Sequence, residues 1–420
     1  MSLLSYNKNT NINLSMKGVH SLMYGLVLEG GGARGAYHMG AYKALIEGGF
    51  KIGGVAGTSV GALNGAMIAQ GDHEKAYEIW HEISYSKIIA ADEEEIRRLR
   101  QMKLDREDIS LLRHRIKEVL HDRGLDITPL KELIWELVDE DRIRNSGMDF
   151  GIVTVSITDL KPLEIYIEDI PNGRLAEYLM ASAYLPVFKR ERIDGKSFID
   201  GAIYNNLPAN LMINKGYKDL IMIRTNGMGI IKKVNLKGIN VMLISPNEDL
   251  GGTLNFDRDT VRYNLKLGYY DGLKAIKGLK GHNYYIEALE DEDYFVNYLL
   301  NLEEQKVNQL KGLFRIDEDI PCKRALFEFI IPKLSTILEI KKDANYENIF
   351  FGLLEKLASI YNVEKFQIYT YYQLLDLVKQ RINVQEDKET KIVDKIIDKV
   401  NFLLLLGREE IIKKTGEIIL

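Results

Sequence analysis

Residues 51–65 read Lys-Ile-Gly-Gly-Val-Ala-Gly-Thr-Ser-Val-Gly-Ala-Leu-Asn-Gly. The first part of this stretch is apolar and contains isoleucine and valine, which is typical of a buried strand in a parallel sheet. The last part is small and apolar and favours a packed helix. Between them stands Gly57-x-Ser59-x-Gly61, in which the glycines lack the Cβ atoms that clash in a sharp strand-to-helix turn. The stretch therefore predicts a serine hydroxyl held clear of the chain at a helix N-terminus, with a simple helix cap at Ser59 as the alternative.

A second glycine-rich loop precedes this turn. Residues 24–29 predict an apolar strand, which leads into Gly-Gly-Gly-Ala-Arg-Gly at residues 30–35 and then into a helix over residues 36–47. Together with the strand expected over residues 52–56, these elements form a compact β-loop-α-β unit. A right-handed crossover brings the glycine loop and Ser59 to the same edge of neighbouring strands, where ligands of open α/β sheets bind.

The composition excludes several classes of protein. The chain has 420 residues, enough for two or three domains, and 46 % of them are hydrophobic, which supports packed cores. A net charge of -5 argues against a nucleic-acid-binding protein. Cys322 is the only cysteine, so neither a disulfide within the chain nor a cysteine-based zinc site is possible.

The sequence also bears on location. No run reaches the ~18 apolar residues of a transmembrane helix. The first twenty residues are polar and do not resemble a signal peptide. We expect a cytoplasmic protein with a flexible leader over residues 1–20, and export without a cleaved signal is the alternative.

The rest of the chain divides into an α/β part and a helical part. Residues 74–147 are helical in pattern, and the highly charged residues 92–122 favour either a solvated helix pair or a mobile cover over the site. Further strands are expected at residues 150–157, 163–168, 197–200, 220–224 and 241–244, and further helices at 128–138, 174–184 and 257–279. We predict a three-layer α/β/α sandwich with a mainly parallel sheet over residues 21–285, followed by an all-helical C-terminal domain over residues 286–420.

Three motifs together indicate acyl transfer by a serine. This chemistry needs a nucleophile, a base and donors for the oxyanion of the tetrahedral intermediate. Ser59 is the candidate nucleophile, and Asp200, in the sequence Asp-Gly-Ala at a strand end, is the candidate base. The backbone N–H groups of Gly31 and Gly32 are the candidate donors, and Arg34 either adds positive charge or locks the loop.

This arrangement resembles the patatin-like phospholipase family, whose members carry a Gly-Gly-Gly-x-Arg loop, a Gly-x-Ser-x-Gly turn and an Asp-Gly-Gly or Asp-Gly-Ala motif in this order. A further stretch, Ala-Ser-Ala-Tyr-Leu-Pro at residues 181–186, is similar to another element of the family. The resemblance covers residues 24–226. It implies a lipid acyl hydrolase that works with a Ser–Asp dyad through an acyl-enzyme, on a lipid substrate at a membrane surface. We expect no metal or other cofactor, because no cluster of aspartate, glutamate and histidine with ligand spacing accompanies the motifs.

Two other readings of the motifs remain open. A Ser-Asp-His triad would require a histidine after Asp200, and His282 is the only one; like His38, it is more simply explained without catalysis. The loop also fits the Gly-x-Gly-x-x-Gly pattern of dinucleotide-binding proteins, but the second strand lacks the acidic residue that would bind the ribose. A further alternative is an interaction protein in which hydrolysis is secondary.

Residues 211–238 are locally basic in an acidic chain. They contain one acid, Asp219, and six basic residues: Lys215, Lys218, Arg224, Lys232, Lys233 and Lys237. The tip comprises Met228, Ile230 and Ile231. The segment predicts either a docking site for anionic membrane near the active-site mouth or a loop of scattered, solvated lysines.

Overall fold

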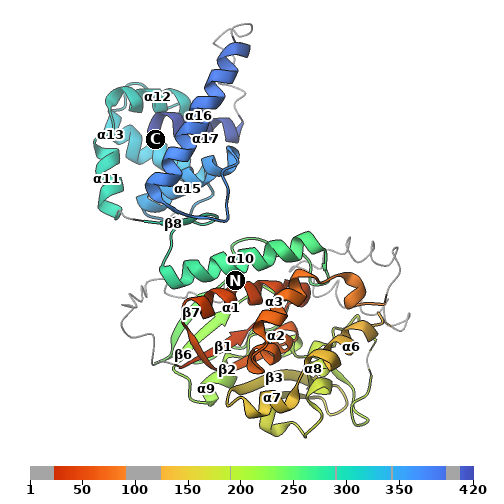
Figure 1. Ribbon diagram of the computed structural model, residues 1–420. Helices are drawn as coiled ribbons and strands as arrows, with labels where there is room; N and C mark the ends of the chain where they lie inside the picture. The colour runs from red at the N-terminus through yellow and green to blue at the C-terminus, as the bar shows by residue number, and fades with distance from the viewer. Residues whose placement is uncertain (1–22, 91–123, 190, 289–290, 342–343, 394–406) are drawn as a thin grey trace. The chain divides into compact units, whose positions relative to one another are not determined.

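The computed structural model describes residues 23–90, 124–189, 191–288, 291–341, 344–393 and 407–420 (Figure 1). The leader expected over residues 1–20 and the charged segment 92–122 lie outside the described residues. The chain divides between Ile276 and Lys277 into two compact units, whereas the sequence placed the boundary after residue 285.

The first unit is built on a seven-stranded, mainly parallel sheet. Its strands run in the order β4-β3-β2-β1-β6-β7, and β5 also pairs with β3. The pairs that involve β4 and β5 are antiparallel and the others are parallel. The strands are β1 (Met23–Leu28), β2 (Lys51–Thr58), β3 (Asp149–Ser156), β4 (Lys161–Tyr166), β5 (Phe198–Asp200), β6 (Asp219–Ile223) and β7 (Asn240–Ile244).

Helices cover both faces of this sheet, so the predicted three-layer α/β/α fold is confirmed. Figure 1 shows α9 on one side of the sheet and α1 and α10 on the other. On one face of the sheet, Val27 of β1, Ala56 of β2 and Val153 of β3 belong to one buried cluster. Leu211 and Met212 of α9 belong to the same cluster. The helices are α1 (Ala36–Glu47), α2 (Val60–Ala69), α3 (His73–His81), α6 (Thr128–Leu137), α7 (Glu140–Asn145), α8 (Leu175–Ala183), α9 (Ala209–Asn214) and α10 (Arg258–Lys277).

The second unit confirms the predicted helical C-terminal part and adds a small sheet. Its helices are α11 (Glu292–Leu300), α12 (Glu304–Phe314), α13 (Cys322–Ala325), α14 (Ile331–Ile337), α15 (Tyr346–Ile360), α16 (Tyr371–Val393) and α17 (Arg408–Ile419). The sheet pairs β8 (Tyr285–Glu287) with β9 (Ile368–Thr370) in parallel. A carboxylate anchors the turn before β8, because Glu355 accepts the backbone N–H groups of residues 282, 283 and 284. In neither unit does a described helix have the length and apolar character needed to cross a bilayer.

Candidate active site

Ser59 lies at the turn between β2 and α2 in a strained backbone conformation. Its φ and ψ are 56° and -126°, a region that L-residues rarely occupy. A Cβ atom on Gly57 would stand 2.2 Å from the carbonyl oxygen of Gly61, and one on Gly61 would stand 2.4 Å from that of Leu28. Glycine is therefore required at both positions, because the turn brings the first residues of α2 into contact with the ends of β1 and β2.

The register along β3 explains how Asp200 reaches Ser59. A strand has two edges, and β4 occupies one edge of β3 from Gly151 to Ser156. On the other edge β2 ends with Thr58 opposite Val153, and β5 takes over with Asp200 opposite the next residue, Thr154. The end of β2, which leads through Ser59 into α2, therefore lies next to Asp200 at the end of the antiparallel strand β5.

The carboxyl group of Asp200 is buried and only partly hydrogen-bonded. Its exposed fraction is 1 %, and its Oδ1 accepts the backbone N–H of Ala202 at 2.8 Å. Burial raises the pKa of Asp200 to about 6, against the smaller, opposite effects of the Ser59 hydroxyl and the Ala202 N–H. Oδ2 has no partner at ordinary hydrogen-bond geometry among the described residues, although the hydroxyl of Ser59 is near enough to lower the pKa. The two side chains therefore face each other at the loose end of hydrogen-bond reach.

Side-chain hydroxyl groups fix the backbone around this pair. The Ser182 hydroxyl accepts the N–H of Ser59 at 2.9 Å and donates to the carbonyl of Val153 at 2.7 Å. The Thr58 hydroxyl donates to the carbonyl of Asn205 at 2.8 Å, which ties the serine turn to the segment after Asp200. The sequence indicated Ser182 only through the family resemblance, and no pattern pointed to Thr58.

The glycine loop that precedes α1 is anchored through both the N–H and the carbonyl of its first residue, Gly30. The N–H of Gly30 donates to the carbonyl of Asn206 at 3.0 Å, and its carbonyl accepts the Thr225 hydroxyl at 2.7 Å. Within the described part of the chain, the N–H groups of Gly31 and Gly32 donate to no acceptor. Gly32 has a positive φ of 58° and lines the same cavity as Ser59. The loop thus offers fixed donors beside the serine.

A buried glutamate that the sequence did not reveal supports this loop. Glu29 directly precedes the glycines and has an exposed fraction of 0 %. Its Oε2 accepts the N–H groups of Thr225 and Asn226 at 2.8 and 2.9 Å, and its Oε1 lies 3.1 Å from the Arg224 guanidinium. The only sequence feature that could have indicated this role is an acidic residue at the end of an apolar strand. Its partners lie almost two hundred residues away in the chain.

Arg34 bridges two loops. Its Nε donates to the carbonyl of Gly251 and its Nη1 to that of Asn226, both at 2.7 Å, and the side chain is buried. These bonds support the loop-locking role that the sequence left open.

The two histidines weighed as bases have other surroundings. His38 of α1 is fully buried, and its Nδ1 lies 3.3 Å from Nδ2 of Asn64. Burial lowers the pKa of His38 to about 3, so it is neutral at physiological pH. His282 belongs to the second unit, where its backbone N–H donates to Glu355.

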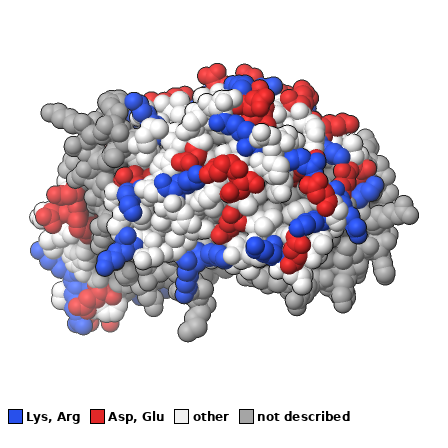
Figure 2. Space-filling model, turned by 90° about the horizontal axis from the view of Figure 1, so that it is seen from below, with Lys and Arg blue, Asp and Glu red and all other residues white. Residues whose placement is uncertain are grey.

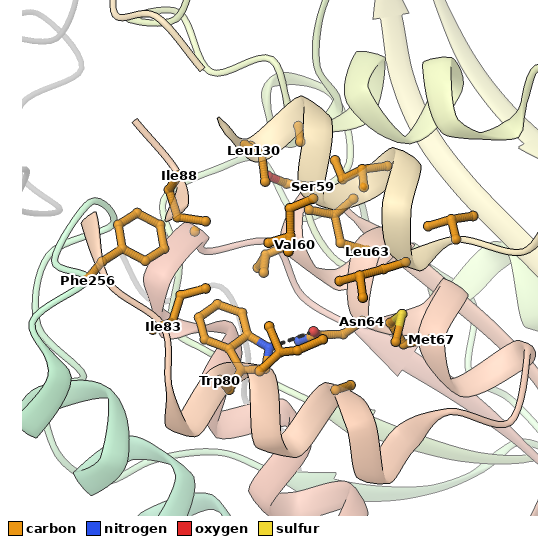
Figure 3. A pocket seen from close by; sticks show the side chains of 18 of the residues that line it. Ser59, Val60, Leu63, Asn64, Met67, Trp80, Ile83, Ile88, Leu130 and Phe256 are labelled. Atoms are coloured by element: carbon orange, nitrogen blue, oxygen red, sulfur yellow. Dashed lines mark hydrogen bonds between the residues drawn. The ribbon is translucent and has the colours of Figure 1, made fainter. Parts of the chain in front are cut away.

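An apolar cavity of about 110 Å³ opens at Ser59 (Figure 3). Its walls come from α2, α3, α6 and the segments around residues 83–88, 183–188 and 254–256. Ser59 and Asn64 are the only polar side chains among its lining residues in the described structure. The serine hydroxyl therefore stands at the end of an apolar compartment, next to a buried carboxylate.

Comparisons with known proteins support the family resemblance. Residues 26–213 match the family model described as patatin-like phospholipase, which confirms the resemblance drawn from the motifs. Patatin-like phospholipase domain-containing protein 7 of Rattus norvegicus is 30 % identical over 47 % of this chain and 13 % of its own length. Neuropathy target esterase sws of Drosophila melanogaster is 29 % identical over 47 % of this chain and 12 % of its own.

The chain thus spans less than a fifth of the length of the curated relatives it matches. Among solved structures, VipD from Legionella pneumophila aligns over 94 % of this chain and 91 % of its own, with 14 % identity and a TM-score of 0.38. The segment of residues 26–213, which holds the glycine loop, the serine turn and the aspartate motif, is thus similar to the patatin-like phospholipase family.

Proposed function

We propose that this chain is a serine lipid acyl hydrolase that cleaves carboxylic ester bonds of lipids through an acyl-enzyme. One observation carries the proposal: a strained, pre-positioned Ser59 faces the buried Asp200 and opens into an apolar cavity. The same site disfavours the dinucleotide-binding alternative, because β2 ends at Thr58 and the next residue is Ser59, so that no acid is available for a ribose.

In the first step the Ser59 oxygen attacks the ester carbonyl while Asp200 takes its proton. A carboxylate with an ordinary pKa near ~3.9 is a weak base for an alcohol. The raised pKa of Asp200, about 6, makes it a stronger base while leaving most of it ionised at pH 7. Proton transfer and attack are concerted, since a free alkoxide would be too unstable.

The N–H groups of Gly31 and Gly32 stabilise the oxyanion of the tetrahedral intermediate. One such donor is worth ~2.7–4 kcal/mol in comparable enzymes. When the intermediate collapses, the C–O bond to the alcohol breaks and protonated Asp200 returns the proton to the leaving oxygen. Water then attacks the acyl-enzyme, with Asp200 again as base, and the released Ser59 regains a proton.

Contact with a lipid surface is supported by isoleucines beside Asp200. Ile203 and Ile230 are 45 % and 57 % exposed, and the N–H of Ile230 donates to the carbonyl of Ala202. The basic patch is smaller than the sequence suggests, because Lys215 forms ion pairs with Asp149 and Glu168. Figure 2 shows cationic and anionic residues intermixed on one face of the molecule. We therefore assign the contact to the isoleucine pair rather than to net charge.

Covalent labelling tests the proposed chemistry. A fluorophosphonate probe should label the wild type and the Ser86→Ala control, which changes an exposed serine, but not Ser59→Ala. Hydrolysis of lipid esters should be lost in parallel. Labelling of Ser59→Ala, or protection by NAD without any labelling of the wild type, would contradict the proposal.

Vesicle pelleting tests the surface contact. An Ile203→Ser/Ile230→Ser double variant should bind neutral and anionic vesicles more weakly than the wild type, and Lys232→Glu/Lys233→Glu should matter mainly on anionic vesicles at low salt. Equal pelleting of all three proteins would remove the membrane contact from the proposal while leaving the hydrolase in place.

A further inference from the structure

We propose that Glu29 is a positioning residue for the oxyanion hole. Its buried carboxylate holds residues 225–227 against the glycine loop and thereby aims the N–H groups of Gly31 and Gly32 at the reacting carbonyl. The inference rests on the proposed hydrolase and adds to it a residue that lies outside the three motifs.

The burial of this carboxylate is the first observation. Glutamate is rarely buried completely, yet Glu29 is 0 % exposed and stands one residue before the glycine loop. Arg224 lies 3.1 Å from its Oε1, and its Oε2 accepts the N–H groups of Thr225 and Asn226. Burying an ion pair costs about as much free energy as the pair returns, so an apolar side chain would often stabilise the fold equally well. The charge therefore indicates a task other than stability.

The residues that Glu29 holds are bonded in turn to the glycine loop. Asn226 has a positive φ of 52°, an uncommon conformation that the bond from its N–H to the carboxylate stabilises. The carbonyl of Asn226 accepts Nη1 of Arg34 at 2.7 Å. The Thr225 hydroxyl donates to the carbonyl of Gly30, also at 2.7 Å. One carboxylate thus anchors the residues that bond to the loop near its start and near its end.

The loop and residues 225–227 approach too closely for a Cβ atom on either side. A Cβ on Gly31 would stand 2.5 Å from Oγ1 of Thr225, and one on Gly227 would stand 2.1 Å from the carbonyl oxygen of Gly30. The peptide planes of the loop must therefore follow any movement of this segment. Oxyanion donors act over only about 2.7–3.1 Å, so a small displacement would weaken both of them.

Replacing Glu29 by glutamine keeps the shape of the side chain but brings donors together. A carboxylate only accepts hydrogen bonds, whereas an amide has one accepting oxygen and one donating NH2 group. Whichever way the new amide turns, its NH2 group meets either Arg224 or the two backbone N–H groups. With p-nitrophenyl butyrate, Glu29→Gln should lower kcat by ~10–100-fold and change KM less than ~twofold, because the lost interaction acts in the transition state.

Glu140 offers a matched control, because it binds the same kinds of partner elsewhere in the first unit. It accepts the backbone N–H groups of Gly173 and Leu175 and the guanidinium of Arg144. Glu140→Gln should lower the midpoint of urea unfolding, as Glu29→Gln does, but keep kcat within ~twofold of the wild type. Wild-type kcat in Glu29→Gln, or the same loss of kcat in both variants, would overturn the inference.

A double variant tests the meeting of donors directly. Arg224→Met removes the guanidinium, so the amide introduced by Glu29→Gln can turn its oxygen to the two backbone N–H groups. Glu29→Gln/Arg224→Met should therefore have a kcat at least ~fivefold above that of Glu29→Gln, a recovery that a general loss of stability would not produce. A folded double variant without this recovery would contradict the proposed role of Glu29.

Thr225 carries the test if Glu29→Gln does not fold, as judged by circular dichroism. Thr225→Val removes the hydroxyl that binds the carbonyl of Gly30 and should lower kcat at least ~fivefold, whereas Thr225→Ser keeps that hydroxyl and should stay within ~twofold of the wild type. Equal kcat in these two variants would refute the path from Glu29 to the loop. If the wild type cleaves no ester and no fluorophosphonate labels Ser59, the proposed hydrolase itself fails instead.

Discussion

Replacing Asp200 by asparagine should remove most of the activity and at the same time stabilise the first unit. Asparagine has the same shape, and its Oδ1 can still accept the Ala202 N–H that now binds the carboxylate. It removes the charge whose burial dominates the environment of Asp200. The change therefore separates the contribution of Asp200 to catalysis from its effect on the free energy of unfolding.

The size and sign of the stability effect follow from the pKa shift. Burial raises the pKa of Asp200 from 3.8 to about 6 in the folded protein. Between these values the folded state binds more protons than the unfolded state, so the free energy of unfolding falls as the pH rises from ~4 to ~6 and then levels off. The shift of roughly two pH units corresponds to ~3 kcal/mol at pH 7.5, because one unit is ~1.4 kcal/mol. Asp200→Asn should recover about this amount at pH 7.5 and less than ~1 kcal/mol at pH 4.

Urea unfolding followed by tryptophan fluorescence measures this effect in the first unit alone. The only two tryptophans of the chain, Trp80 and Trp135, both belong to that unit. With a denaturant slope of ~3 kcal/mol per molar, the unfolding midpoint should rise by about 1 M at pH 7.5. Asp141→Asn, which changes an exposed aspartate of α7, is the control and should shift stability by no more than ~0.5 kcal/mol.

Ester hydrolysis by Asp200→Asn should fall by ~10²–10⁴. In the wild type it should decline about tenfold per pH unit below pH 6, as the base becomes protonated. A variant that is less stable at pH 7.5, or that keeps wild-type activity, would refute the reasoning. The second outcome would also reopen the case for His282 as a base.

Three further predictions concern the surroundings of the dyad. Ser182→Ala should lower kcat more than it raises KM and destabilise the first unit by ~1–3 kcal/mol, because it leaves the buried N–H of Ser59 without its acceptor. Ser182→Thr should retain part of the activity and part of the stability. Steady-state kinetics measure the activity, and urea titrations measure the stability. Gly61→Ala should prevent native folding or displace Ser59, because its Cβ would meet the Leu28 carbonyl oxygen at 2.4 Å; retention of full probe labelling would count against this. Dialysis against a chelator should leave ester hydrolysis unchanged, because the proposed steps use only side chains and backbone N–H groups, and a loss restored by added metal would contradict them.

The elements of the first unit could be predicted from the sequence because their patterns are local. The helix expected over residues 36–47 is α1 with the same bounds, and the strand expected over residues 24–29 is β1 to within one residue. Glycine on both sides of Ser59 predicted a turn that the close approach of Gly57 to Gly61 explains. In each case the information lies within a few neighbouring residues.

The features that were missed depend on partners far away in the chain. The sequence located Asp200 at a strand end but could not show that β5 is antiparallel to β3. It counted Lys215 in a basic patch, whereas the fold pairs that lysine with Asp149 and Glu168. The strands β8 and β9 have three residues each, too few for an alternating pattern to distinguish them from loops.

The meeting of β2 and β5 along one edge of β3 has a consequence for how the length of this chain can vary. Two neighbouring residues of β3 set the separation of Ser59 and Asp200, since Thr58 stands opposite Val153 and Asp200 stands opposite Thr154. The forty-odd residues that link β3 to β5, including β4 and α8, do not enter this separation. They can lengthen or shorten wherever they leave the contacts of Ser182 intact, whereas one residue gained or lost between Val153 and Thr154 would turn the following side chains to the opposite face of the sheet. Insertions and deletions in that connection would therefore leave Ser59 and Asp200 in place, whereas the middle of β3 has to keep its length.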